Sequence, residues 1–339
     1  MASDLFTLAE IESALPVVRA AVPPTPQYAW PQLAARTGAD VFVKHENHTP
    51  TGAFKVRGGL VYIDRLLRLQ PQVKGVVLAT RGNHGQSLAF AAQRAGIAAV
   101  IVVPHGNSVE KNAAMRAFGA KLIEHGCDFD EAKEHAAAMA SQYGYAFVPS
   151  FHRDLVIGVA TYAYEFFTAI SNVDTVYVPI GLGSGICGVI GMRDALGLAT
   201  RIVGVVSQHA NGYARSFAAG KVIATDTAHT FADGLAVRVP DAAALDVIRQ
   251  GADRIVEVSE PELVEAIGIY FTDTHTVAEG AGAATLAALL KERDRMHGRR
   301  VGLVLSGQNI DRAVMSEVLV GRVPGRPEQS GQVTFHLSL

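Results

Sequence analysis

Short apolar segments alternate with longer helical patterns along almost all of this 339-residue chain. Several of the short segments are apolar at consecutive positions, which is typical of parallel strands covered by helices on both faces. This alternation predicts an α/β fold with open, mainly parallel sheets. The predicted strands span residues 41–44, 76–80, 99–103, 121–124, 146–148, 176–180, 202–206, 255–258 and 302–305. Helical patterns lie between them, for example over residues 86–95, 131–141, 260–271 and 281–292.

Nine strands are many for one open sheet, so we expect two α/β domains. Residues 75–148 contain four closely spaced strands and predict a small domain. This domain is inserted into a larger one, which is built from residues 1–74 and 149–339. The Gly/Pro-rich tail after Val320 predicts a loop that leads to a short terminal strand over residues 333–337.

Composition excludes several classes of partner. A formal net charge of −2 leaves no basic footprint for nucleic acid or for an acidic membrane. No apolar run approaches the ~20 residues that a membrane span needs, and the acidic N-terminus does not resemble a signal peptide, so we expect a cytoplasmic protein. Cys127 and Cys187 are too few for a disulfide framework or a metal site, and we expect both to be small buried hydrophobic residues.

A lysine stands at the start of a helical pattern in the segment TPTGAFKVRGG, residues 49–59. Helix N-termini repel cations, so Lys55 is not an obvious stabilising choice there. A desolvated lysine beside positive backbone dipoles has a lowered pKa, which an imine-forming amine requires. The alternative is a surface lysine that happens to precede a helix.

A polar turn, TRGNHGQS at residues 80–87, directly follows the strand predicted over residues 76–80. A strand, a tight turn and a helix start let backbone N–H groups converge on an anion. Asn83 and Gln86 add side-chain donors. The alternative is an ordinary turn in which Asn83 caps the helix.

A glycine-rich segment, VPIGLGSGICG at residues 178–188, also follows a predicted strand. Glycines let the backbone approach a phosphate, and the next helix N-terminus supplies donors. Gly183 to Gly188 fits the GxGxxG dinucleotide fingerprint, but that fingerprint needs a ribose-binding carboxylate about 20 residues further on. The next strand ends in Val206, Ser207 and Gln208. A single phosphate therefore fits better than a dinucleotide.

Ser306 follows the last predicted strand, in LSGQNID at residues 305–311. A small hydroxyl at a strand end points into the crevice where open α/β sheets bind ligands. The alternative is an ordinary turn with Asn309 or Asp311 capping the next helix. Together the four segments offer an amine, anion donors, a phosphate-binding loop and a hydroxyl, which are the parts of a pyridoxal-phosphate site.

With these segments in this order, the chain resembles the threonine/serine dehydratase branch of the fold-type II pyridoxal-phosphate enzymes, which includes serine racemase. The resemblance covers residues 24–311. Within that branch, KHENHTPTGAFKVRGG, ATRGNHGQSLAFA and PIGLGSGICG most resemble the threonine-dehydratase-like enzymes of hydroxyectoine utilisation. The resemblance implies a tryptophan synthase β-like architecture and a homodimer. It also implies that the larger domain binds pyridoxal 5'-phosphate and that the small domain lies on the substrate side.

The resemblance also implies a role for each matching residue. Lys55 would hold the cofactor as a Schiff base and move the Cα proton. Phe54 would pack against the cofactor ring, Asn83 would bond its 3-hydroxyl, and Ser306 would meet the pyridine nitrogen. The phosphate-binding residues would be Gly181, Leu182, Gly183, Ser184 and Gly185. The substrate-binding residues would be Thr80, Arg81, Asn83 and His84.

The implied reaction is an α,β-elimination, as in a dehydratase or ammonia-lyase. Substrate amine displaces Lys55, which then removes the α-proton as general base. The β-hydroxyl leaves as water, and hydrolysis of the product gives a keto acid and ammonia. A neutral hydroxyl at Ser306 would leave the pyridine largely unprotonated, which favours loss of a β-leaving group over transamination.

Arg81 departs from the serine racemase pattern. It stands where racemases have the serine that carries the second proton, and arginine does not deprotonate at ordinary pH. We therefore do not expect racemase activity. A guanidinium in the substrate loop predicts an extra anionic or acetylated polar group on the substrate. The alternative is an arginine that faces solvent or a structural carboxylate.

Other departures from the family pattern concern the divalent-cation site, the glycine loop and the turn after Ser306. The positions that match the family's divalent-cation ligands are Val206, Ala210 and Gly212, so we predict no metal site. Glu279 matches a Glu-x-x-Gly element beside the cofactor, with a role that could be purely structural. Three residues stand where the family mostly has glycine, namely Leu182, Ser184 and Gln308.

Three functions compete with elimination from a β-hydroxy amino acid. A β-replacement enzyme would use the same chemistry with a thiol nucleophile. A ligand sensor would keep the fold and cofactor without turnover, which the intact Lys55, Asn83 and Ser306 argue against. A dinucleotide-dependent reductase would lack its ribose carboxylate. The candidate substrates are threonine, serine, 3-hydroxyaspartate and a hydroxylated diaminobutyrate derivative.

Overall fold

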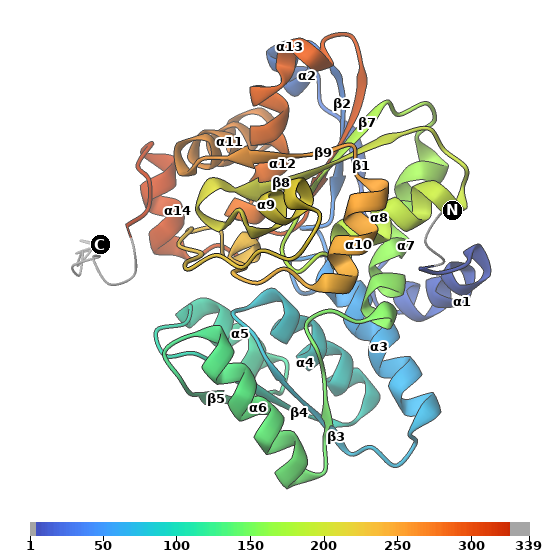
Figure 1. Ribbon diagram of the computed structural model, residues 1–339, viewed down its shortest axis with the longest axis vertical. Coiled ribbons are helices and arrows are strands. Elements are labelled where there is room, and N and C mark those ends of the chain that lie inside the picture. Colours follow the sequence, from blue (N-terminus) through green and yellow to red (C-terminus); the bar gives the residue numbers. More distant parts are fainter. Residues whose placement is uncertain (1–4, 326–339) are drawn as a thin grey trace, which may run out of the picture.

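The computed structural model describes residues 5–325, which form two mainly parallel sheets (Figure 1). The larger sheet has six strands in the order β1–β2–β10–β7–β8–β9. Strand β1 is antiparallel to β2, and the other neighbours are parallel. In chain order these strands are β1 (Gln27–Ala29), β2 (Asp40–His45), β7 (Thr175–Pro179), β8 (Arg201–Ser207), β9 (Arg254–Val258) and β10 (Arg300–Leu305).

The smaller sheet lies in the lower lobe of Figure 1 and has four parallel strands in the order β5–β4–β3–β6. Its strands are β3 (Gly75–Ala79), β4 (Ala98–Val103), β5 (Lys121–Glu124) and β6 (Ala146–Phe147). Both sheets are therefore of the kind that the strand–helix alternation predicts.

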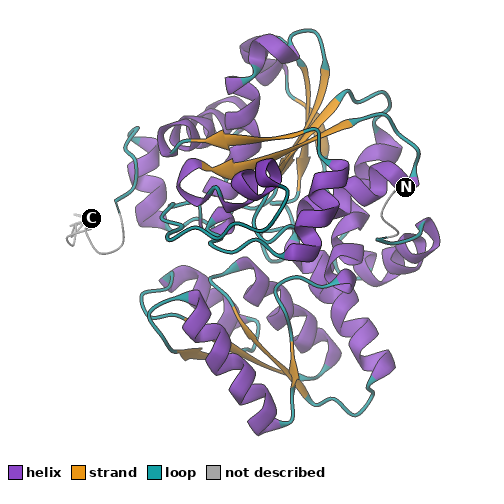
Figure 2. Ribbon diagram, in the orientation of Figure 1, coloured by secondary structure: helices purple, strands orange, loops and turns teal. Residues whose placement is uncertain are grey.

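Helices connect and cover the strands (Figure 2). In the first part of the chain they are α1 (Leu8–Arg19), α2 (Pro31–Thr37), α3 (Lys55–Leu69), α4 (Asn83–Ala95), α5 (Val109–Ala117), α6 (Phe129–Tyr143) and α7 (Arg153–Ala169). In the second part they are α8 (Ser184–Ala195), α9 (Gly212–Ala219), α10 (Ala242–Gly251), α11 (Glu260–Thr274), α12 (Gly280–Lys291), α13 (Arg293–Met296) and α14 (Arg312–Leu319). Two short 3-10 turns are η1 (Gln208–Ala210) and η2 (Asp233–Leu235).

Alternate residues of the buried strands enter different cores, because successive side chains point to opposite faces of a sheet. Val176 and Val178 of β7 join the core that contains α7 and α8, whereas Tyr177 joins the core that contains α11 and α12. Strand β3 repeats the pattern, since Leu78 packs with α4 and Val77 packs with α6. Each sheet is thus covered on both faces.

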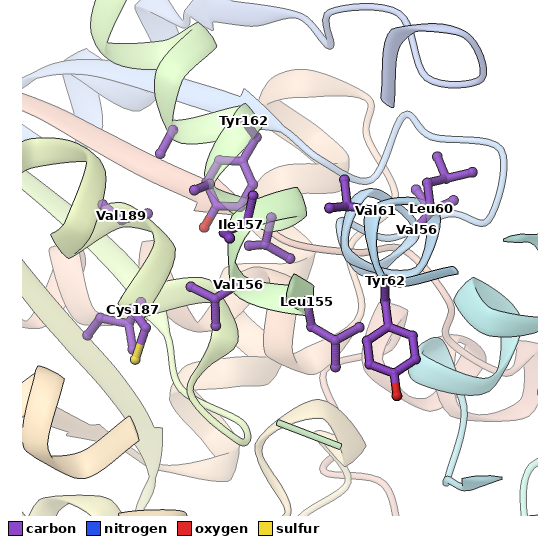
Figure 3. Close-up of a cluster of buried hydrophobic side chains, with 14 of the residues drawn as sticks. Val56, Leu60, Val61, Tyr62, Leu155, Val156, Ile157, Tyr162, Cys187 and Val189 are labelled. Atoms are coloured by element: carbon purple, nitrogen blue, oxygen red, sulfur yellow. The ribbon is translucent and has the colours of Figure 1, made fainter. Parts of the chain in front are cut away.

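Helix α3 packs against both α4 and α7. Figure 3 shows the apolar contact between α3, α7 and α8, with Val56 and Val61 on α3, Val156 on α7, and Val189 on α8. This core continues to the strands of both sheets. Lys55 is the first residue of α3, so the helix that carries it is anchored in the core between the two sheets.

The nine predicted strands are confirmed, with ends that differ by one or two residues. The predicted helical patterns are confirmed as α4, α6, α11 and α12. Strand β1 was not predicted, because it is a three-residue edge strand whose partly exposed residues show no apolar run. The strand predicted over residues 333–337 lies outside the described residues. The domain boundaries at residues 75 and 148 stay a prediction.

The prediction that both cysteines are buried is confirmed for one and wrong for the other. Cys187 is buried, but Cys127 is exposed in the loop between β5 and α6. There its thiol donates to Glu131 Oε1 at 3.2 Å and its backbone N–H donates to Glu131 Oε2 at 2.8 Å. Cys127 is thus part of a polar turn before a helix and does not contribute to the core. Among the described helices, none is both long and apolar enough to span a membrane.

Candidate active site

The four segments predicted to form a site lie next to one another in the structure. The backbone N–H of Phe54 donates to the carbonyl oxygen of Ser306 at 3.0 Å. The Phe54 ring lies against the glycine loop, since a Cβ at Gly185 would be 3.5 Å from it. Asn83 is tied to the segment after β10 by Asn309, whose Nδ2 donates to Asn83 Oδ1 at 2.8 Å. The amine, the polar turn, the glycine loop and the hydroxyl therefore share one site.

The amine of Lys55 has a lowered pKa. Burial lowers it from 10.5 to about 8, although the nearby Glu279 carboxylate acts to raise it. The amine lies 5.0 Å from the centre of the Phe54 ring, and its place at a helix N-terminus further disfavours a cation. Roughly a tenth of such amines are neutral at pH 7, so Lys55 can act as a nucleophile or a base.

This pKa predicts how the reactivity of Lys55 depends on pH in the cofactor-free protein. Only the neutral amine reacts with acetic anhydride, so trace acetylation of Lys55 should reach half its maximal rate near pH 8. An unperturbed lysine reaches half its maximal acetylation rate at a pH about 2 units higher. Peptide mass spectrometry over pH 6–11 measures both rates in one sample. A Lys55 rate that rises only above pH 10 would contradict the lowered pKa.

A second buried feature fixes the start of α3. Arg57 is fully buried, and its guanidinium forms two-pronged contacts with the carboxylates of Glu46 and Glu165 at 2.8–3.0 Å. Lys44 Nζ also donates to Glu165 Oε2 at 2.7 Å. The network thus pairs two cations, Arg57 and Lys44, with two carboxylates. Because Arg57 is two residues after Lys55, this network fixes the helix end that carries the amine.

The glycine loop, residues 181–185, runs from the end of β7 into α8. Gly183 has φ of 101°, a left-handed conformation that favours glycine. A Cβ at Gly181 would collide with the carbonyl oxygen of Gly234, so this position also needs a bare backbone. The Leu182 carbonyl accepts from the Tyr213 hydroxyl at 3.1 Å. Helix α8 begins at Ser184, and the first amides of a helix are free to bind an anion.

The polar turn after β3 is organised by Thr80, and Asn83 does not cap α4. Thr80 Oγ1 accepts from the backbone N–H groups of Gly82 at 3.0 Å and Gly85 at 3.3 Å. Asn83 instead uses its side chain inside the site, donating from Nδ2 to Glu279 Oε1 at 2.7 Å. The alternative role of Asn83 as a helix cap is therefore wrong, because Gly82 is the N-cap residue and Thr80 binds the amide of Gly85 in the first turn.

His84 lines a cavity with Lys55. The cavity is lined by Lys55, Gly58, His84, Ser150, Leu155, Val159 and Ser184. Burial and the nearby Lys55 lower the pKa of His84 to about 3, so its imidazole is neutral at pH 7. Its Nε2 is buried and has no hydrogen-bond partner among residues 5–325, which leaves an acceptor for a ligand. Arg81, at the start of the same loop, is exposed.

Ser306 is buried at the end of β10. The turn that follows it is crowded, because a Cβ at Gly307 would lie 2.5 Å from Glu279 Oε1. Glu279 is buried, and that burial raises the pKa of its carboxyl. The turn that follows Ser306 therefore lies against the Glu279 carboxyl, which also contacts Asn83.

The predicted site list missed several residues that shape this site. Glu279 and Asn309 contact Asn83 directly. Lys111 of α5 lies under the same loop, since a Cβ at Gly82 would meet its Cδ at 2.6 Å. The sequence signal for Glu279 was its match to a Glu-x-x-Gly element beside the cofactor, which did not identify Asn83 as its partner. Asn309 and Asp311 were considered as helix caps, but Asp311 immediately precedes α14 without a side-chain capping bond.

This fold and this set of groups suit a cofactor-dependent enzyme of the pyridoxal-phosphate class, since they combine a buried lysine of lowered pKa with a glycine loop at a helix start and a buried hydroxyl at a strand end. The family described as "Pyridoxal-phosphate dependent enzyme" matches residues 18–307. The chain belongs to this family, and its cofactor is pyridoxal 5'-phosphate.

Two characterised relatives are ammonia-lyases. The chain is 33% identical over 316 residues to the L-threonine ammonia-lyase of Thermotoga maritima, covering 93% of this chain and 78% of that protein. It is also 33% identical over 305 residues to the L-threo-3-hydroxyaspartate ammonia-lyase of Pseudomonas sp, covering 88% of this chain and 93% of that protein.

Solved structures show the same fold. The processed form of threonine deaminase isoform 2 from Solanum lycopersicum has a TM-score of 0.84 and 26% identity, covering 93% of this chain and 94% of that one. Maize serine racemase has a TM-score of 0.86 and 26% identity, covering 93% and 97%. The predictions of the fold-type II architecture, of the cofactor and of a lyase like the threonine/serine dehydratases are confirmed.

The residues present fit the cofactor. The bare backbone at Gly181 and Gly183 and the start of α8 suit a phosphate. The partly neutral amine of Lys55 suits a covalent link to an aldehyde. Ser306 offers a neutral hydroxyl at a strand end, and Asn83 offers an amide N–H in the same site.

Proposed function

We propose that this chain eliminates water from a small β-hydroxy amino acid and so yields a keto acid and ammonia. The observation that carries this proposal is the Lys55 amine, whose pKa is about 8, in a cavity next to the glycine loop and the Asn83 turn. Threonine- and 3-hydroxyaspartate-specific ammonia-lyases among the relatives support the reaction class.

Each side chain of the site has a separate proposed role. When bound, pyridoxal 5'-phosphate supplies an electron sink for the electrons released at Cα. Lys55, in its neutral form, removes the α-proton and holds it for return. The backbone amides of Arg81, Asn83 and His84 would bind the substrate carboxylate, because those of Thr80 and Gly82 already have partners within the protein. Neutral His84 offers Nε2 as an acceptor. Ser306 offers the pyridine nitrogen a hydroxyl that does not force its protonation.

A substrate panel tests this function. The purified protein would be incubated with L-threonine, L-serine, the 3-hydroxyaspartate isomers and a hydroxylated acetyl-diaminobutyrate. Ammonia and keto acid would be assayed after each incubation, with and without an added thiol. Product release without thiol is expected from at least one compound. A thioether product instead would assign the chain to β-replacement, and binding without any product would assign it to the ligand sensors.

We propose that Arg81 selects the substrate side chain. The guanidinium is exposed at the start of the substrate loop, where it can form two parallel hydrogen bonds to an anionic or acetylated group. With the three segments that resemble hydroxyectoine-utilisation enzymes, this favours a hydroxylated diaminobutyrate derivative over threonine. The threonine and 3-hydroxyaspartate specificities belong to the relatives.

The Arg81→Met variant should distinguish the substrates. We expect kcat/KM to fall roughly 10- to 100-fold for compounds with an extra anionic or acetylated group, because a charged hydrogen bond is lost. L-Serine, which lacks such a group, should be affected less than about threefold, and Arg81→Lys should restore part of the loss. An equal fall in kcat/KM for all substrates would show that Arg81 does not recognise the substrate side chain.

We also propose that residues 75–148 close over the substrate as a small domain. A few polar contacts join α5 to segments of the larger sheet, among them Lys111 Nζ to Asp233 Oδ2 at 2.8 Å and Ser108 Oγ to Asp311 Oδ1 at 2.5 Å. These contacts would have to break for this part of the chain to rotate away from the larger sheet. Crystal structures with and without a ligand should differ by a rotation of this part, and identical arrangements would contradict closure.

The assembly and location follow from the resemblance alone. We propose a cytoplasmic homodimer. Light scattering should then give twice the chain mass of 35.9 kDa, and cell fractionation should place the protein with cytoplasmic markers. A monomer, or recovery with membranes, would contradict these two proposals.

A further inference from the structure

Asn309 is held by contacts to two separate segments of the site. Its Nδ2 donates to the carbonyl oxygen of Thr51 at 2.8 Å and to Asn83 Oδ1 at 2.8 Å. Thr51 lies in the loop before Lys55, and Asn83 begins α4. The side-chain oxygen of Asn309 is close to Gly52, where a Cβ would lie 2.5 Å from it. Little freedom is left for this side chain to rotate.

These contacts determine which way the Asn83 amide points. A backbone carbonyl can only accept, so the Asn309 atom facing Thr51 must be the NH₂ nitrogen. That nitrogen has a second hydrogen, which it donates to Asn83. Only the oxygen of the Asn83 amide can accept it, so this oxygen faces Asn309. The NH₂ of Asn83 is left to face the opposite way, where it donates to Glu279 Oε1 at 2.7 Å.

We propose that Asn309 is a positioning residue that orients the Asn83 amide so that its N–H points into the cofactor site. The inference rests on the proposed role of Asn83 as the donor to the 3-hydroxyl oxygen of the cofactor ring. Without Asn309, only the contact to Glu279 holds the amide, and a half rotation would present an oxygen to that position. Two acceptors would then face each other, which weakens cofactor binding and changes the ionisation of the ring oxygen.

The Asn309→Asp variant is the sharpest probe, because a carboxylate of the same shape cannot donate to Thr51 or to Asn83. We expect the dissociation constant of pyridoxal 5'-phosphate to rise roughly 10- to 100-fold, in line with the loss of one hydrogen bond to a charged group. We also expect the visible absorption band of the loaded protein, followed against pH, to shift its midpoint. Asn172→Asp, which makes the same change at an exposed position in the loop before β7, is the matched control and should leave both unchanged.

A double-mutant cycle separates positioning from a general structural role. In an Asn83→Ala background, Asn309→Asp should weaken cofactor binding by less than about twofold, because no amide remains to be oriented. Asn309→Ala serves as a second variant if Asn309→Asp fails to fold by circular dichroism. Additive losses in the cycle, or a wild-type-like affinity and band in both variants, would overturn the inference. A wild-type protein that forms no visible band with the cofactor would instead overturn the proposed function.

Discussion

The Lys55→Ala variant is expected to lose the visible absorption band of the loaded protein and to turn over at least about 10³-fold more slowly than the wild type. Both effects have one cause, because the amine that links the cofactor is also the base that moves the α-proton. Borohydride reduction followed by peptide mass spectrometry should place the trapped cofactor on Lys55 in the wild type and on no residue in the variant.

Lys133→Ala is the matched control for this prediction, since Lys133 is an exposed lysine on α6 of the smaller sheet. It should leave the band and the turnover unchanged. Cofactor trapped on another lysine, or turnover retained in Lys55→Ala, would contradict the assignment of Lys55.

The Arg57→Met variant is expected to lower the free energy of unfolding by about 3–5 kcal/mol, because it leaves the buried Glu46 carboxylate without its cationic partner. Arg57 contacts both Glu46 and Glu165, and all three side chains are almost fully buried. Urea unfolding followed by circular dichroism measures the change.

The double variant Arg57→Met with Glu46→Gln tests the cause of that loss. It removes the carboxylate that Arg57→Met leaves unpaired and should recover part of the stability. A loss below about 1 kcal/mol in Arg57→Met, or no recovery in the double variant, would show that the network does not anchor the start of α3.

Much of the fold was predictable because the buried strands are nearly continuous apolar runs. Runs of this kind, such as β4 and β7, are visible in the sequence whatever they pack against. Edge strand β1 has no such run, because its residues are partly or fully exposed. Cys127 was misplaced because a single residue between a strand and a helix carries no periodicity from which burial can be inferred.

The site was predictable where function depends on local chemistry. Lys55, the glycine loop and Ser306 each follow a turn or a strand end in the sequence, and parallel sheets bring such ends together. Contacts between distant side chains were not predictable. Arg57 and Glu165 are 108 residues apart and Asn83 and Asn309 are 226 apart, and nothing in either local sequence identifies its partner. These long-range pairs hold the predicted groups in position.

The most direct test of the central claim is to measure ammonia and keto acid in one reaction of the loaded protein with the best compound of the substrate panel. Elimination of water followed by hydrolysis predicts equal amounts of the two products, released by the wild type and by Lys133→Ala but not by Lys55→Ala. If the cofactor binds with its visible band but neither product is released from any β-hydroxy amino acid, the chain is not a dehydratase of this class.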